Sequence, residues 1–87
     1  MTEHYLNTAL WAATCAAWDA MQSAELDGVE RAEALTSAFN AAERKALPEL
    51  SMIIDDATLL AAYSRAVAHE AVVMVHTRGK PPMLGSC

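Results

Sequence analysis

The sequence predicts an all-α fold: a compact bundle of three main helices with a short helical turn and an extended C-terminal tail. Nineteen of the 87 residues are alanine, which has the highest intrinsic helix propensity. Apolar residues also recur at three- and four-residue steps, the periodicity of a helix with a buried side. We expect a single domain, residues 1–79, followed by the tail, residues 80–87. The expected helices span about residues 2–26, 28–46 and 56–78, with the short turn near 48–54.

The first helix is predicted from Thr2–Leu26, a stretch without Gly or Pro. With residues placed about 100° apart around a helix, two adjacent faces are apolar. One face consists of Leu6, Leu10, Ala13, Ala17, Met21 and Ala24. The other consists of Trp11, Cys15 and Trp18. A helix that is apolar over so wide an arc is either central in the bundle or reserves one face for a partner.

The second helix is expected to begin at Asp27-Gly28, because Asp27 can cap it. It should end before Leu47-Pro48, since proline fits the first turn of a helix but not its interior. Its expected buried stripe is Ala32, Leu35, Phe39, Ala42 and Ala46. The helical turn that should follow is indicated by the spacing of Leu50, Ile53 and Ile54.

The third helix is expected to be capped by Asp55 or Asp56. With Asp55 as the cap, Ile54 and Leu59 would occupy the positions of a hydrophobic staple. The helix should end where Gly79 can supply a left-handed C-cap. Its expected buried face is Leu60, Tyr63, Val67, Ala71 and Met74, with Leu59, Ala66 and Val73 alongside.

The charge distribution describes an acidic body with a mildly basic end. The net charge is −5, and residues 1–56 carry ten acids against three bases. Nucleic-acid binding normally needs a basic stripe, so we expect no direct nucleic-acid partner. The longest apolar runs are about ten residues, short of the roughly 18 to 20 that span a bilayer, so we expect no membrane partner. An acidic surface suits a basic patch on another protein, including one that normally holds nucleic acid.

The cysteines and the N-terminal region predict a cytoplasmic location. Cys15 and Cys87 have neither CxxC spacing nor the density of a disulfide scaffold. The apolar stretch at residues 9–17 is not preceded by the basic segment of a secretion signal. We therefore expect a cytoplasmic chain with free thiols.

Catalytic and metal-binding patterns are weak. His69, Glu70 and His76 are the residues of one alternative, a metal- or acid–base-dependent enzyme subunit completed across a dimer. However, His69 and His76 lie two turns apart, about 10 Å along the axis, which is too far for both to hold one ion. Glu70 falls beside the expected buried face, where a long acid more often keeps its head in water than acts as a catalyst. We expect no metal, no other cofactor and no enzymatic activity.

The leading hypothesis is a non-enzymatic protein-binding module. It would act as a small acidic inhibitor, adaptor or regulator that occupies a surface of a larger protein, with tryptophan as an anchor because tryptophan is enriched at binding hot spots. The alternative is that both tryptophans belong to the core. A purely structural homo-oligomer is a further alternative, since a chain with few bulky core residues often completes its burial against a second copy. The expected contact residues are Trp11, Cys15, Trp18, Asp19, Glu25, Asp27, Glu30 and Glu33.

Overall fold

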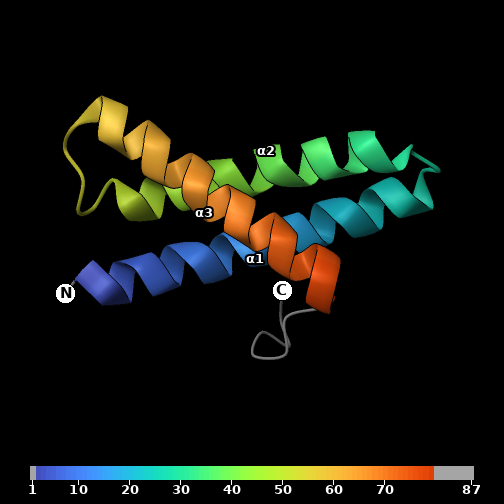
Figure 1. The fold of residues 1–87 in the computed structure, drawn as a ribbon, viewed down its shortest axis with the longest axis horizontal. Coiled ribbons are helices and arrows are strands. Elements are labelled where there is room, and N and C mark those ends of the chain that lie inside the picture. Colours follow the sequence, from blue (N-terminus) through green and yellow to red (C-terminus); the bar gives the residue numbers. More distant parts are fainter. Residues whose placement is uncertain (1, 80–87) are drawn as a thin grey trace.

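Three helices form the part of the chain that the structure, a computed structural model, describes, residues 2–79 (Figure 1). They are α1 (Thr2–Leu26), α2 (Arg31–Leu50) and α3 (Ala57–Arg78). α1 and α2 run antiparallel, and α3 crosses them (Figure 1). Each helix contacts both others. Residues 2–79 contain no strand, which confirms the predicted all-α bundle of three main helices. The predicted tail, residues 80–87, lies outside the described residues.

The end of α1 is closed by Gly28. Gly28 has a φ of 72°, and the amide of Val29 donates to the carbonyl of Ala24 at 2.9 Å. This is the usual way in which a left-handed glycine terminates a helix. The chain therefore needs residues 27–30 for the connection, and α2 begins at Arg31 rather than at residue 28. Glu30, not Asp27, is its N-cap, and its side chain makes no capping hydrogen bond.

Pro48 lies inside α2, which continues to Leu50 instead of ending before the proline. Proline removes one backbone hydrogen bond, but the helical pattern resumes at once, because the amide of Ser51 donates to the carbonyl of Leu47 at 2.9 Å. Leu50 is completely buried and anchors this last turn. The short turn predicted near 48–54 is therefore the end of α2 and the turn at residues 51–53.

Both ends of α3 are set by single residues. The carboxylate of Asp56 accepts a hydrogen bond from the amide of Leu59 at 3.0 Å, so Asp56 is the cap of the two candidates. Ile54 and Leu59 are consequently not at the staple positions. At the other end Gly79 has a φ of 77°, and its amide donates to the carbonyl of Val75. The C-cap is therefore at the predicted residue, but its ψ of −147° lies outside the left-handed helical region.

The core consists mainly of the smallest apolar side chains. On α2 the buried residues recur at every fourth position: Ala34, Ala38, Ala42, Ala46 and Leu50. α1 contributes Ala9, Ala13, Thr14, Ala17 and Ala24. α3 contributes Ser64, Ala68, Ala71 and Val75. Rows at four-residue spacing are the ridges along which helices pack, and small side chains on them let the backbones approach closely.

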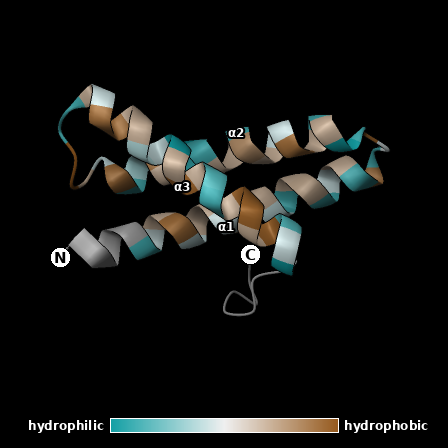
Figure 2. Cartoon of the chain, viewed as in Figure 1, coloured by the Kyte–Doolittle hydropathy of each residue, from teal (hydrophilic) through white to brown (hydrophobic). Residues whose placement is uncertain are grey.

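Several bulky residues expected in the core lie at its edge or outside it. Leu35 and Phe39 are half-buried, and Ala32 is exposed. Tyr63 is 48% exposed, although helical spacing predicts it on the buried face of the third helix. Figure 2 shows hydrophobic residues at several positions along α3, with hydrophilic ones between them and in its last turn. These bulky residues lie outside the core because helices that touch through alanine leave too little space between them for larger side chains.

Candidate functional site

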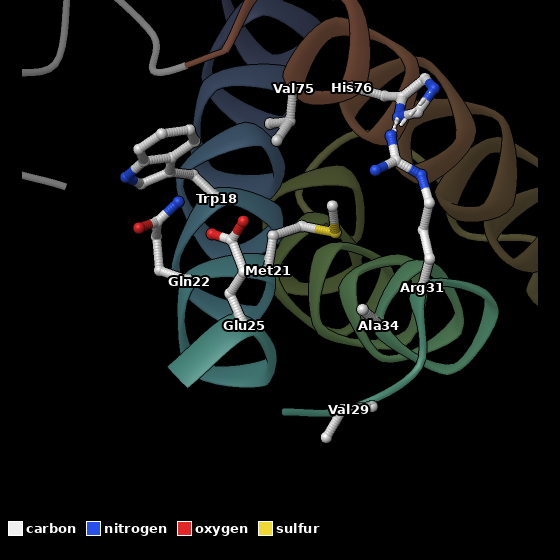
Figure 3. A pocket seen from close by; sticks show the side chains of 9 residues that line it. All are labelled: Trp18, Met21, Gln22, Glu25, Val29, Arg31, Ala34, Val75 and His76. Atoms are coloured by element: carbon white, nitrogen blue, oxygen red, sulfur yellow. Dashed lines mark hydrogen bonds between the residues drawn. The ribbon is translucent and has the colours of Figure 1, made fainter. Parts of the chain in front are cut away.

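A surface pocket of about 260 Å³ lies at the end of the bundle where α1 connects to α2 (Figure 3). All three helices contribute to it, because the end of α1, the start of α2 and the end of α3 meet there. The lining residues are Trp18, Met21, Gln22, Glu25, Val29, Arg31, Ala34, Val75 and His76.

The α1 wall of the pocket follows from helical spacing. Trp18, Met21 and Glu25 are three and four residues apart, so they lie on one side of the helix. Trp18 and Met21 are half-buried and pack against the core, whereas Glu25 is exposed. This wall therefore combines an apolar surface with a carboxylate at its rim.

The opposite wall carries a guanidinium held by an imidazole. Nη2 of Arg31 lies 2.8 Å from Nδ1 of His76. Arginine has only donors, so the imidazole of His76 accepts this hydrogen bond. Figure 3 shows the Arg31 and Glu25 side chains on different sides of the pocket. The hydrogen bond joins the first residue of α2 to the last turn of α3.

Four acidic residues lie in the last turn of α1, the connection to α2 and the first turn of α2. Glu25, Asp27, Glu30 and Glu33 are all exposed. Among residues 7–79, whose side chains the structure describes, none of them forms an ion pair; the bridge observed there joins Arg65 to Glu43 at 3.6 Å. Residues 25–33 thus carry four acids against one base, Arg31, and the pocket opens beside a segment of net negative charge.

The predicted aromatic face is only partly assembled into this site. Trp11, Cys15 and Trp18 are all half-buried, but of the three only Trp18 lines the pocket. Cys15 is disulfide-bonded, so the prediction of free thiols is wrong for this residue. The absence of CxxC spacing excludes only a disulfide between cysteines that are close in the sequence. A disulfide requires the two cysteines to be close in space, which spacing in the sequence does not show. The acid Asp19 is exposed but does not line the pocket.

Arg31 and His76 were not among the predicted contact residues. Their pairing joins positions 45 residues apart, and no local pattern in the sequence indicates it. Their neighbours Met21 and Val29 were likewise missed, because an apolar residue near a helix end gives no signal that distinguishes a pocket wall from the core.

The residues of the enzyme alternative lie apart. His69 and Glu70 are exposed, and His69 lines a shallow groove with Leu35, Phe39 and Val72. His76 faces a different pocket, next to Arg31. Among the described residues, no three His, Cys, Asp or Glu side chains are close enough together to hold a metal ion.

Comparison with protein-family models, with curated proteins and with solved structures gives no match to this chain. Over the part that the structure describes, no helix combines the length and the apolar character needed to cross a membrane. The function is therefore inferred from the chain's own residues and their geometry.

Proposed function

We propose that the chain is a non-enzymatic protein-binding module whose acidic end occupies a basic surface of a larger protein. One observation carries this proposal: four exposed carboxylates that form no ion pair among residues 7–79 lie within residues 25–33, and one of them, Glu25, lines a pocket with an apolar wall. We call this region the acidic end and define it by Glu25, Asp27, Glu30, Glu33 and the pocket that Glu25 lines.

The charges and the pocket have different roles in binding. Exposed carboxylates attract a basic surface over several ångströms, which raises the association rate and favours basic partners. They add little affinity by themselves, because exposed ion pairs are weak. Affinity needs an anchor that is removed from water, and the pocket between the three helices can take one.

A lysine or arginine side chain of the partner matches the pocket. Its aliphatic part would lie against Trp18 and Met21, and its charged head would reach the carboxylate of Glu25. The cation of Arg31 lies away from that carboxylate and is held by His76. A module that covers basic residues in this way would act as an inhibitor, adaptor or regulator of the partner.

The test is capture of the partner from a lysate of the source cells, with a charge-matched control. One variant combines E25Q, D27N, E30Q and E33Q. The control variant combines D19N, E49Q, D55N and E70Q. It also removes four negative charges, but from exposed or half-exposed positions outside the acidic end. We expect one basic partner to be retained by the wild type and the control and lost by the variant, with binding that weakens as salt rises.

A partner retained equally by both variants would place the binding surface elsewhere and contradict the proposal. Capture of no partner by the wild type would also count against it. Trp18→Ala, which removes part of the apolar wall of the pocket, should also weaken binding of the partner. The thermal unfolding of this variant must be measured as well, because Trp18 packs against the core.

A further inference from the structure

A row of exposed apolar side chains runs along the outer side of α3. Leu59, Tyr63 and Val73 are 53%, 48% and 41% exposed. The row falls within an arc of roughly 100°, on the side opposite to the buried residues of the helix, such as Ala68. We call this surface the α3 stripe; it consists of Leu59, Ala62, Tyr63, Ala66, Glu70 and Val73, all of them exposed.

The α3 stripe is complementary to itself when two copies meet in antiparallel orientation. If Ala66 faces Ala66 of a second copy, Leu59 faces Val73, since both are seven residues from Ala66. Each end of the contact then pairs two bulky apolar side chains. Such a symmetric pairing is the usual geometry of a homodimer.

Small residues occupy the middle of this contact. Ala66 and Ala62 would let the two helices approach closely, as the buried alanines do between α1 and α2. Glu70 would lie opposite Ala62, because both are four residues from Ala66. Its aliphatic part could cover the alanine while its carboxylate remains in water at the edge.

The charges at the ends of α3 select the antiparallel orientation. Asp55 and Asp56 precede the helix, and Arg78 lies in its last turn. An antiparallel pair places the acids of each copy beside Arg78 of the other, at both ends of the contact. A parallel pair would place like charges together, which is unfavourable.

We propose that the α3 stripe is the contact surface of an antiparallel homodimer centred on Ala66. The second copy would cover the bulky apolar side chains that the alanine core leaves outside. This proposal does not depend on the proposed function, because it concerns the purified chain alone.

The first test measures self-association by analytical ultracentrifugation over a range of protein concentrations. Ala66→Glu would place two carboxylates at the centre of the contact, and we expect it to weaken the dimer at least tenfold. Ala32→Glu is the matched control, since Ala32 is an exposed alanine on α2, and it should leave the dimer unchanged. Both variants should keep their helicity by circular dichroism, because neither position is buried.

The second test examines the orientation by charge reversal. Arg78→Glu and Asp55→Lys should each weaken self-association, because each places like charges together at both ends. A mixture of the two variants should form a heterodimer, since each end would again join opposite charges. No recovery in the mixture would overturn the antiparallel arrangement. A wild type that stays monomeric up to about 1 mM, or a dimer that survives Ala66→Glu, would overturn the proposed surface.

Discussion

Among residues 7–79, the buried polar side chains are Ser64 and Thr14, and they differ in their hydrogen bonding. The hydroxyl of Thr14 donates to the carbonyl of Leu10 at 2.6 Å. The hydroxyl of Ser64 has no partner among the described residues, although the side chain is fully buried. A buried hydroxyl without a hydrogen bond costs about 1–3 kcal/mol. Ser64 fits the tight packing by its size while it lowers the stability of the bundle by its chemistry.

Ser64→Ala is therefore expected to stabilise the protein by about 1–2 kcal/mol. Part of the gain, about 0.5 kcal/mol, would come from the higher helix propensity of alanine. Ser37→Ala isolates that part, because Ser37 is an exposed serine in the middle of α2. Urea unfolding of both variants measures the difference. Equal gains would mean that the hydroxyl of Ser64 is hydrogen-bonded in solution.

At the scale of the helix, the ends of the elements depend on a few local contacts. Gly28 and Gly79 both have a positive φ, which glycine adopts readily, and each lies at the end of a helix. Asp56 starts α3 with a side-chain hydrogen bond, whereas Glu30 starts α2 without one. The start of α2 relies instead on Arg31, whose guanidinium binds the last turn of α3. The two helix starts are thus stabilised by different means, one local and one tertiary.

Asp56→Ala should destabilise the protein by about 0.5–2 kcal/mol, because it removes the hydrogen bond to the amide of Leu59. Asp55→Ala removes the same charge one residue earlier and has no capping bond to lose, so a much smaller effect is expected. The comparison requires thermal or urea unfolding at one protein concentration. Equal losses in the two variants would assign the effect to charge rather than to capping.

At the scale of the whole molecule, an alanine core brings the helices close together but buries little apolar surface per residue. Leu50 is the largest completely buried side chain among those that the structure describes. It lies in the last turn of α2, within the cluster that contains residues of all three helices. The stability of the bundle should therefore be unusually sensitive to this one side chain.

Leu50→Ala is expected to destabilise the protein by about 2–5 kcal/mol, through lost burial and the cavity that remains. That is a large share of the roughly 5–15 kcal/mol typical of a folded domain. Leu26→Ala removes the same atoms from a side chain that is 88% exposed, and its effect should stay within about 0.5 kcal/mol. A small effect at Leu50 in chemical unfolding would show that the core adjusts to fill the space.

The candidate site was only partly predictable from the sequence. Trp18 and Glu25 were expected among the contact residues, and the structure places both on one pocket wall. Trp11 and Asp19 were expected with them but do not line it. Helical spacing can group residues on one helix, but it does not indicate which side of that helix another helix will cover.

The sequence by itself determined the number of helices, the bounds of α1 and the end of α3 at Gly79, because each depends on residues a few positions apart. The tertiary structure decided which face of each helix is buried, that α2 continues through Pro48, and that Arg31 meets His76. The physical reason is that burial depends on how closely two helices can approach. Alanine allows the closest approach, so the small residues took the interior and the bulky ones, such as Tyr63, remained outside.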